Sequence, residues 1–564
     1  MIFLSKINAP FLRFDFIISS NDVDAGDAAA AAGFPVDTFA TSATASIAEG
    51  AGAFVSDILS EGYRDFKENG ISFIMGIPSY FRNILRSYPG CLIKKVSADI
   101  LCFDFNCLIY RCIKTQPADS SDIDIWEDGL IQEIKKTVLE VWREAGKPKK
   151  VFIAVDGVVP MAKIRQQRVR RFKSAWLRAS KGSSDSWDTN AITPGSRFME
   201  KLDIVLKGID SRWLVSGFSE EGEGEHKIMK WLRSFPEGGS VIVYGLDADL
   251  ILLTMLVGEE TGRQLYLMRE KQEFGNKETS NEYQFMDIRE FQKRLGLVGE
   301  NEVINYIALM SLMGNDFLPH SLTHKLSENG HEFVTHEMTL LKSDKWLVES
   351  GELDFNVLRQ IFQRWSQNEE EFLLHTIRKK EEQAKRAQVP KGMDESEGLP
   401  LKWAVEGSLT HEGKLKDSWR DEYWKFIHPL IKPQDMNRIC HEYIKGFSWI
   451  LDYYRGRQVN RSWMFPAWIP PLWSDLAKFT GELLKDTSPG ITPLPQEQLA
   501  MVLPLESWGL IRDPRLRRLP HLAPQMWPRK FGFISLGRKW LWECEALIPV
   551  LTASRLRDIL KEEI

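Results

Sequence analysis

Two pairs of acidic residues stand close together in the chain and are its first candidates for chemistry. Glu223 and Glu225 lie in the run GEGEHK, and Asp247 and Asp249 lie in YGLDADL. Carboxylates held this close repel one another unless protons or a divalent cation neutralise them. A ligand set made only of oxygen atoms suits Mg²⁺ or Mn²⁺ better than zinc. These two runs therefore predict either raised carboxyl pKa values or a magnesium site.

Three predicted strands position acidic residues at one edge of a sheet. They span residues 98–105, 150–155 and 241–244, and a predicted helix at 128–145 joins the first two. A strand, a helix and a strand of these lengths indicate a parallel sheet. Asp104, Asp156 and the Asp247 pair then follow C-terminal strand ends, where open α/β sheets place their ligands. One such aspartate is more often an ordinary turn residue, but three at the same position favour a metal site.

Two further residues near these acids carry weaker signals. Asp316 follows a predicted helix that Gly314 ends, and by itself it would be an ordinary turn residue. His226 stands beside Glu225 at the start of another predicted helix. Because the neighbouring candidate ligands are all hard oxygen donors, we interpret His226 as a structural residue rather than a direct ligand.

A strongly basic stretch follows the second predicted strand. Eight basic residues and no acidic one lie between residues 157 and 184. Helical spacing over residues 161–177 gives the stretch one shared side, formed by Lys163, Gln167, Arg170, Arg171 and Ser174. The alternative is a solvated helix face, but such a face usually mixes charges in a chain whose net charge is −5. An unmixed cluster beginning seven residues after Asp156 favours a phosphate-binding pocket.

The composition is that of a globular protein with room for several domains. The 564 residues are 43% hydrophobic and 27% charged, and no apolar run approaches the roughly 18 residues of a membrane helix. The six cysteines form no CxxC pair, and none lies between Cys112 and Cys440. We therefore expect neither a disulfide framework nor a cysteine zinc site. We expect the protein to reside in a reducing compartment.

The chain divides into four predicted segments. Residues 1–74 form a low-complexity, disordered N-terminal extension, and residues 75–368 hold the predicted strands. Residues 369–398 indicate a charge-dense helix followed by a linker. Residues 399–564 are predicted to be helical and contain eleven of the nineteen tryptophans, most of which we expect in the core.

As an ordered set, the motifs resemble those of the Xrn-type 5′→3′ exoribonuclease family. The matching runs are MGIPSYFR at Met75, FDFN at Phe103, VDGVVPMAKIRQQRVRRF at Val155, ITPG at Ile192, GEGEHKIM at Gly222, YGLDADLI at Tyr244 and GNDFLP at Gly314. Weaker matches continue with DYYRG at Asp452, PLWSDL at Pro471, EQLAMVLP at Glu497 and ALIP at Ala546. The resemblance implies an α/β fold like that of PIN and flap nucleases. Its parallel or mixed central sheet would be flanked by helices and wrapped by a mainly helical C-terminal region.

The resemblance also implies site residues, position by position. Seven carboxylates would hold two Mg²⁺ ions, for which Mn²⁺ can substitute, namely Asp104, Asp156, Glu223, Glu225, Asp247, Asp249 and Asp316. The 5′-phosphate would be bound by Lys163, Gln167, Arg170 and Arg171. Tyr110 stands where relatives stack a histidine on the first bases, and Trp463 is the candidate for the second stacking aromatic. Tyrosine can still stack on a base, although it carries no switchable proton at neutral pH.

The activity that the resemblance implies is hydrolysis of single-stranded RNA with a 5′-monophosphate, one mononucleotide at a time. The protein would act in RNA decay or processing as a monomer without a membrane partner. It would work inside the cell, with the cytoplasm favoured over the nucleus.

The sequence departs from the family pattern in three places. The MGIP methionine follows 74 residues, no cysteine-rich zinc knuckle separates the YGLDADL and GND runs, and the sequence stops soon after ALIP. Two alternatives also stay open. One is a structure-specific flap-type DNA nuclease on a similar carboxylate-rich core, against which QQRVRRF and GEGEHK favour the RNA exonuclease. The other is a catalytically inactive RNA-binding scaffold protein, against which the complete carboxylate set argues.

Overall fold

The computed structural model describes most of the chain beyond the N-terminal segment. Described are residue 80 and residues 87–115, 122–181, 187–271, 282–326, 330–386, 398–403, 405–427, 432–482 and 486–561. The predicted extension at 1–74 and nearly all of the linker predicted before residue 399 lie outside the described residues. Within the described part of the chain, no helix combines the length and the apolar character needed to cross a bilayer.

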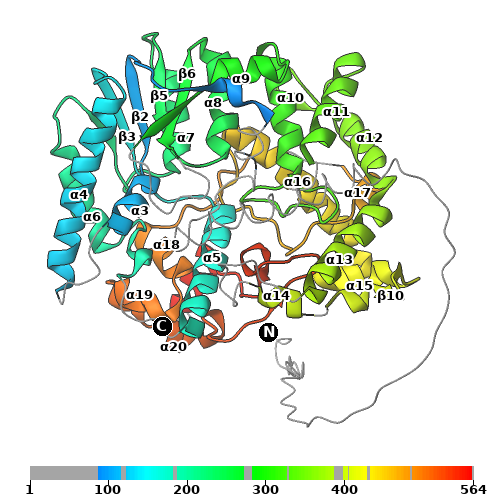
Figure 1. Ribbon diagram of the computed structural model, residues 1–564. Helices are drawn as coiled ribbons and strands as arrows, with labels where there is room; N and C mark the ends of the chain where they lie inside the picture. Colours follow the sequence, from blue (N-terminus) through cyan, green and yellow to red (C-terminus); the bar gives the residue numbers. More distant parts are fainter. Residues whose placement is uncertain are drawn as a thin grey trace, which may run out of the picture. The chain divides into compact units, whose positions relative to one another are not determined.

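A seven-stranded sheet forms the centre of the N-terminal half of the described chain (Figure 1). Its strands are β1 (Leu92–Ile93), β2 (Ile100–Asp104), β3 (Lys150–Ala154), β4 (Leu214–Ser216), β5 (Val241–Tyr244), β6 (Leu265–Glu270) and β7 (Tyr283–Asp287). The spatial order is β1-β7-β6-β5-β2-β3-β4. Strands β2 to β6 run parallel, whereas β7 is antiparallel to both β6 and β1. The predicted mixed sheet is confirmed.

The register brings the C-terminal ends of three strands to one level. Asp104 pairs with Ala154 across β2 and β3, and Phe103 pairs with Tyr244 across β2 and β5. Because β2 lies between β3 and β5, the turns that follow these strands leave the sheet side by side. The edge predicted from the sequence therefore exists, with Asp104 as the last residue of its central strand.

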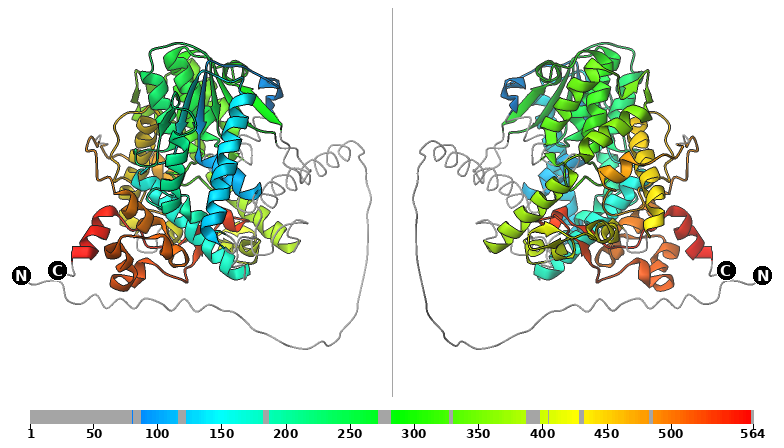
Figure 2. Two further views of the ribbon diagram at one scale, coloured as in Figure 1. Left: turned by 90° about the vertical axis from the view of Figure 1, so that its left-hand side faces the viewer. Right: turned by 90° about the vertical axis from the view of Figure 1, so that its right-hand side faces the viewer.

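Helices cover both faces of the sheet because the strands are apolar on both (Figure 1, Figure 2). The bounds are α3 (Asn106–Thr115), α4 (Ile123–Glu144) and α6 (Arg197–Lys207) on one face, and α7 (Gly224–Ser234), α8 (Asp249–Thr261), α9 (Ile288–Arg294) and α10 (Gly299–Leu312) on the other. In β2, Ile100 and Cys102 pack with the second group, while Leu101 and Phe103 pack with the first. This alternation is the period-2 pattern of a strand buried on both sides.

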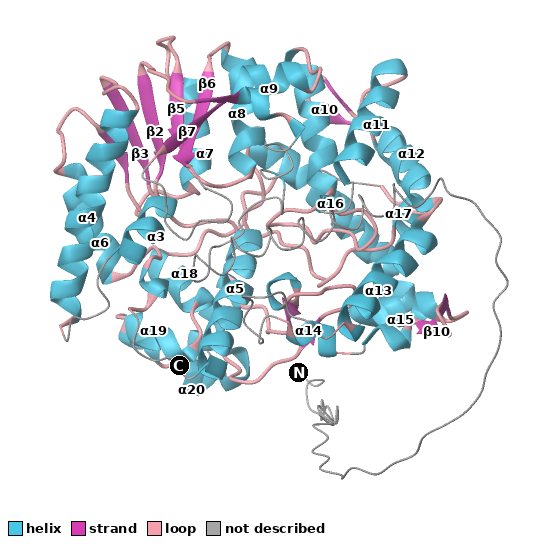
Figure 3. Cartoon of the chain, viewed as in Figure 1, coloured by secondary structure: helices cyan, strands magenta, loops and turns pink. Residues whose placement is uncertain are grey.

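The rest of the described chain is mainly helical (Figure 3). The remaining helices are α5 (Met161–Lys181), α11 (Gly330–Ser343), α12 (Phe355–Ser366), α13 (Glu369–Lys385), α14 (Leu399–Lys402), α15 (Trp419–Ile427), α16 (Met436–Tyr454), α17 (Trp473–Ala477), α18 (Pro495–Val502), α19 (Pro514–Arg517), α20 (Leu519–Leu522) and α21 (Ala553–Lys561). Three two-stranded sheets pair β8 (Val348–Glu349) with β9 (Glu352–Leu353), β10 (Thr410–His411) with β11 (Lys414–Leu415), and β12 (Phe533–Ile534) with β13 (Glu545–Ala546). Short 3₁₀ turns are η1 (Pro89–Cys91), η2 (Thr189–Ala191), η4 (Val405–Ser408), η5 (Pro433–Asp435), η6 (Leu505–Leu510), η7 (Pro524–Met526) and η8 (Leu541–Glu543).

The C-terminal half shares its hydrophobic core with the sheet half. Residues of α16 and α17 belong to the same buried cluster as α7, α8 and α10. Met161, Ile164 and Phe172 of α5 pack in a second cluster with α18 and α21. The predicted helical region that wraps the sheet is therefore confirmed. All eleven tryptophans beyond residue 399 are buried or half-buried, as predicted for core residues.

Candidate active site

The seven predicted carboxylates come from three strand ends and three helix ends. Asp104 ends β2, Asp156 lies two residues after β3, and Asp247 lies between β5 and α8. The other four stand at helix termini, with Glu223 capping α7, Glu225 in its first turn, Asp249 opening α8 and Asp316 following α10. Elements far apart in the sequence thus direct acidic side chains to the same edge of the sheet.

One pocket collects five of these carboxylates together with the predicted phosphate-binding residues. It holds about 600 Å³ of empty space including its open mouth. Its charged and polar lining consists of Asp104, Asp156, Glu223, Glu225, Asp247, Asn106, Tyr110, Lys163, Gln167, Arg170 and Arg171. All four phosphate-site candidates and five acids therefore face one cavity. Asp249 and Asp316 are not part of this lining. Asp316 pairs with Lys163, which does line the pocket, and Asp249 accepts a hydrogen bond from Tyr454.

Lys163 stands between two of the acids. Its Nζ lies 2.5 Å from Glu223 Oε2 and 2.6 Å from Asp316 Oδ2, and its side chain is only 8% exposed. Gln166 also donates to Asp316, from Nε2 to Oδ1 at 3.3 Å. Burial opposes the charge on Lys163, but Asp316 and Glu223 outweigh it and raise the pKa of the ammonium group well above its usual range. The lysine is thus a fixed positive charge at the centre of the acidic cluster.

Asp156 is held by the neighbouring strand end and by the start of α7. Its Oδ1 accepts a hydrogen bond from the Gly224 N–H at 2.7 Å, and its Oδ2 accepts one from Asn106 Nδ2 at 3.0 Å. In turn, Asn106 Oδ1 accepts a hydrogen bond from the Asp156 N–H at 3.2 Å. A Cβ at Gly224 would lie 2.7 Å from the Ala154 oxygen and 2.8 Å from Asp104 Oδ1, so only glycine lets α7 approach this closely. Sequence reasoning missed Asn106, although the FDFN motif contains it.

Burial raises the pKa values of most of these carboxyl groups, and repulsion adds to it. The pKa of Asp104 is raised to about 8, with Asp156 as the next cause, and that of Asp249 to about 7, with Asp316 as the next cause. Burial is also the largest cause of the raised pKa values of Asp156, Glu225 and Asp247. Glu223 differs, because burial opposes its charge but Lys163 and other partners bring its pKa below the usual range.

The donor set fits a hard divalent cation. Among the described residues, Oε2 of Glu225 is buried without a hydrogen-bond partner. Ionising Glu225 costs free energy, because it is buried and the acids around it repel its charge. In the described part of the chain, Glu223, Glu225 and His226 offer ligand atoms that all lie within 4.8 Å of one another. Burial lowers the pKa of His226 to about 4, so its ring is neutral at physiological pH. A cation beside these oxygens would supply the missing positive charge.

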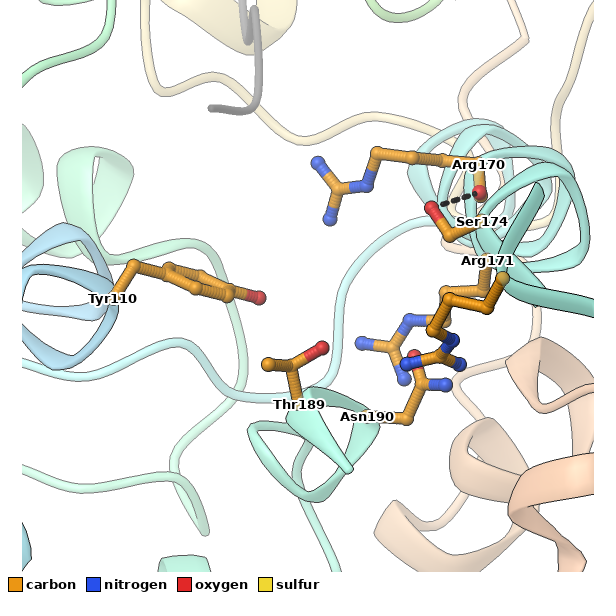
Figure 4. A pocket seen from close by; sticks show the side chains of 7 residues that line it. Tyr110, Arg170, Arg171, Ser174, Thr189 and Asn190 are labelled. Carbon is orange, nitrogen blue, oxygen red and sulfur yellow. Dashed lines mark hydrogen bonds between the residues drawn. The ribbon is translucent and has the colours of Figure 1, made fainter. Parts of the chain in front are cut away.

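A second pocket shares Tyr110, Arg170 and Arg171 with the first and is built by α3, α5 and the turn at η2 (Figure 4). Tyr110 and Arg170 reach into the same open space from opposite sides, and Arg171, Ser174, Arg178, Thr189 and Asn190 complete the lining. The Arg171 guanidinium donates to Thr193 Oγ1, a residue of the ITPG motif that sequence reasoning did not assign. Burial lowers the pKa of Arg171 to about 10, which still leaves the group charged. The geometry offers fixed positive charge to an anion.

Only part of the basic stretch faces this pocket. Arg165 donates to the Ala467 oxygen at 2.9 Å, and Lys173 donates to the Trp542 and Cys544 oxygens at 3.0 and 2.7 Å. Arg168 is 2% exposed and makes three hydrogen bonds to carbonyl groups of the C-terminal half. The absence of acidic residues on α5 therefore has two causes, because one side lines the pocket and the other satisfies buried carbonyls.

The two predicted stacking aromatics lie in different surroundings. Tyr110 is half-buried and lines the pocket beside the arginines. Trp463 is 5% exposed and packs on Trp449 with ring centroids 5.2 Å apart, while its Nε1 donates to Glu442 Oε2 at 3.2 Å. It does not line the pocket, so a stacking role for Trp463 stays a prediction that its position does not favour.

Two adjacent tyrosines at the end of α16 also reach the acids. The hydroxyl of Tyr453 donates to Glu223 Oε1 at 2.8 Å, and that of Tyr454 donates to Asp249 Oδ2 at 3.0 Å. Burial is the largest cause that raises the pKa of both phenols well above the usual range, so both keep their protons and act as donors. Both belong to the DYYRG run, which was the one signal in the sequence that pointed to them.

Two protein-family models match most of the described chain. The model described as the XRN 5′-3′ exonuclease N-terminus matches residues 75–271, and that of the Xrn1 helical domain matches residues 410–563. The first model covers the predicted strands and both acidic runs, together with the basic helix. The second covers α15, α16 and the tyrosine pair.

Relatives with known names align over most of the chain. The 5′-3′ exoribonuclease 1 of Homo sapiens is 27% identical over 86% of this chain and 34% of its own length. The protein of the same name from Saccharomyces cerevisiae is 24% identical over 86% of this chain and 43% of its own length. The 5′-3′ exoribonuclease 2 homolog of Drosophila melanogaster is 24% identical over 86% of this chain and 70% of its own length. The chain thus spans a third to a half of the length of the first two relatives.

Among solved structures, the catalytic core of Rad2 in complex with a DNA substrate aligns with this chain. The TM-score is 0.30 and the identity 14%, over 78% of this chain and 98% of that one. A TM-score this low is too weak to carry an argument about the fold or the site.

Proposed function

Because the chain belongs to the XRN 5′-3′ exonuclease family, we propose that it is a 5′→3′ exoribonuclease that hydrolyses single-stranded RNA bearing a 5′-monophosphate. The observation that carries the proposal is the shared cavity. Five carboxylates and the four candidate phosphate-binding residues line one pocket, and Tyr110 lines it as well. A chain end and a scissile bond could therefore be held in one place.

The basic side of the pocket suits a terminal phosphate. Arg170, Arg171 and Gln167 offer planar N–H donors, which bind phosphate oxygens in pairs. Tyr110 presents a ring beside them, and stacking of a base on such a ring contributes about 1–3 kcal/mol. Binding of the 5′-terminal phosphate fixes the position of the RNA in the pocket, so that its first phosphodiester bond lies next to the acids. A 5′-triphosphate or a cap would place additional bulk against the buried guanidinium of Arg171.

The acidic side suits divalent cations. We propose that the seven carboxylates hold two Mg²⁺ ions, with Mn²⁺ as a substitute, through the oxygen donors Asp104, Asp156, Glu223, Glu225, Asp247, Asp249 and Asp316. When bound, such ions activate a water molecule and neutralise the charge that develops on the leaving oxygen. Asn106 and the Gly224 N–H keep Asp156 oriented, and Lys163 neutralises part of the acidic charge.

A comparison of matched RNA ends tests the substrate assignment. We expect Mg²⁺-dependent release of mononucleotides from RNA with a 5′-monophosphate, and much slower release from RNA with a 5′-triphosphate or a 5′-hydroxyl. A 5′-phosphorylated flap DNA serves as the comparison for a DNA nuclease. Equal rates on all three RNA ends, or faster cleavage of the flap DNA, would contradict the proposal. RNA binding without any release of nucleotides would instead favour an inactive scaffold.

The Asp249→Asn substitution tests the role of the acids. Asparagine keeps the size of the side chain and an acceptor for Tyr454, but it loses the negative charge. Loss of a mere partner of a metal ligand typically lowers activity by about 10–100-fold, and Asp249 is proposed as a ligand itself. We therefore expect hydrolysis to fall by about 100-fold or more, with an unchanged melting temperature in EDTA. A matched control is Asp210→Asn, which changes a carboxylate that pairs only with the exposed Arg212. Near wild-type turnover by the Asp249→Asn variant would show that this carboxylate is not part of the active site.

A further inference from the structure

The end of α16 enters the acidic cluster from the C-terminal half of the chain. Tyr453 and Tyr454 are 8% and 1% exposed, and each hydroxyl donates to one acid, Glu223 at 2.8 Å and Asp249 at 3.0 Å. These acids stand at the starts of α7 and α8. Two consecutive residues thus connect two helices that are separate in sequence.

The ring of Tyr453 contacts neighbours of two further acids. It lies on His226, next to Glu225, with ring centroids 3.9 Å apart. It meets Phe317, which follows Asp316, edge to face at 5.4 Å. On its other side it stacks on Trp449 of the same helix at 4.9 Å. The ring therefore packs between Trp449 of its own helix and the segments that carry Glu223, Glu225 and Asp316.

The backbone at the end of α16 is itself fixed. Arg233, in the last turn of α7, donates from Nη2 to the Tyr454 oxygen at 3.2 Å and pairs with Glu260 of α8 at 2.6 Å. Arg457 binds Asp452 at 3.1 Å and the Gly351 oxygen at 2.8 Å. Because this end of the helix is fixed, each tyrosine hydroxyl holds its carboxylate partner in one rotamer and does not move with it.

We propose that Tyr453 and Tyr454 are positioning residues that set the affinity of the acidic cluster for divalent cations. Each phenol occupies one oxygen of its carboxylate, which fixes the direction of the remaining lone pairs. Partners of metal ligands act in this way, and their loss typically weakens metal binding by about 10–100-fold. The inference rests on the proposed function, because it assumes that Glu223 and Asp249 hold cations. It adds that the C-terminal half completes the site.

A purely structural role makes a different prediction. If the hydroxyls only satisfied buried carboxylates, their removal would lower the stability of the protein and leave its affinity for a cation unchanged. The ring contacts of Tyr453 survive in phenylalanine, so a Tyr→Phe change removes the hydroxyl alone. Tyr443 provides the matched control, since it lies on the same helix, is fully buried, and its hydroxyl has no hydrogen-bond partner in the part of the chain that the structure describes.

The experiment measures Mn²⁺ binding to the full chain by titration calorimetry, without RNA. We expect Tyr453→Phe and Tyr454→Phe each to weaken Mn²⁺ binding by about 10-fold or more, and Tyr443→Phe to leave it unchanged. The Mg²⁺ concentration for half-maximal RNA hydrolysis should rise by a similar factor, while the rate at saturating Mg²⁺ recovers most of the wild-type value. Either tyrosine can carry the test if the other variant fails to fold.

Three outcomes overturn the inference, and they are distinguishable. If the wild type binds Mn²⁺ and degrades RNA but both phenylalanine variants bind Mn²⁺ equally well, the tyrosines are structural and the proposed function stands. The same holds if Tyr443→Phe weakens binding as much as they do. If the wild type neither binds Mn²⁺ nor degrades RNA, the proposed function fails and this inference fails with it.

Discussion

At the scale of single residues, Lys163 has two possible partners for its charge. The resemblance assigns it to the 5′-phosphate, and it does line the pocket with Gln167 and Arg170. Its nearest charged neighbours are acids, however, because Glu223 and Asp316 lie at 2.5 and 2.6 Å from its Nζ. A buried lysine that pairs with two acids reduces their repulsion, and the same ammonium group remains next to the space where a phosphate would sit. One residue can therefore connect the acidic and basic sides of the pocket.

The Lys163→Gln substitution should expose this balance. Removing one partner of a buried ion pair leaves the other charge uncompensated, which costs about 3–5 kcal/mol. We expect urea denaturation in EDTA to show a loss of this size, and added Mg²⁺ to restore part of it. Lys136→Gln is the control, since Lys136 pairs with Glu133 on the surface and such pairs contribute at most about 1 kcal/mol. Equal denaturation midpoints for Lys163→Gln and the wild type would show that the buried acids do not need this charge.

At the scale of elements, His324 forms the meeting point of three helices in the C-terminal half. Its ring stacks on Trp365 of α12 at 5.0 Å and meets Phe372 of α13 and Trp473 of α17 edge to face, at 5.5 and 5.7 Å. The Trp473 Nε1–H donates to Nδ1 at 3.0 Å. Because an indole N–H can only donate, Nδ1 must keep its lone pair and the ring must stay neutral. Burial accordingly lowers the pKa of His324 to about 4.

This histidine should make the stability depend on acid. In the unfolded chain the ring titrates near 6.5, so below that pH the unfolded state binds a proton that the folded state refuses. Stability is therefore complete above about pH 6.5 and is lost as the pH falls toward about 4, by up to about 3 kcal/mol. We expect the stability difference between the wild type and His324→Gln to shift by this amount across that range. Stability curves for His324→Gln that run parallel to those of the wild type would contradict the assignment.

The sequence predicted the strands and helices that carry the site better than the contacts between residues far apart in the chain. The strands that end at Asp104 and Asp156 are short apolar runs whose pattern is local, and their C-terminal ends are where the acids were expected. The contact of Tyr453 with Glu223 joins residues 230 positions apart, which no local pattern encodes. The same limit applies to Trp463, because tryptophan occurs both in cores and on binding surfaces, and only the packing on Trp449 distinguishes the two.

At the scale of the whole molecule, α5 joins the two halves of the chain. One side of this helix presents Arg170 and Arg171 to the pocket, and the other side is buried against the C-terminal half. Arg168 makes the largest set of these contacts, with its guanidinium at 3.1 Å from the Pro549 oxygen, 2.6 Å from the Met501 oxygen and in contact with the Met526 oxygen. It also lies over the ring of Phe172, 4.6 Å from its centroid.

Neighbouring arginines on α5 should therefore separate stability from substrate recognition. Arg168→Met leaves three buried carbonyl groups without a donor, at about 1–3 kcal/mol each, so we expect a lower melting temperature and faster proteolysis within residues 486–561. Arg170→Met removes a charge that faces the pocket, so we expect a normal melting temperature and a reduced preference for a 5′-monophosphate over a 5′-hydroxyl. Thermal melting, limited proteolysis and RNA hydrolysis on both proteins measure these effects. The two-sided role of the helix is wrong if Arg168→Met alters the end preference without altering stability, or if Arg170→Met does the reverse.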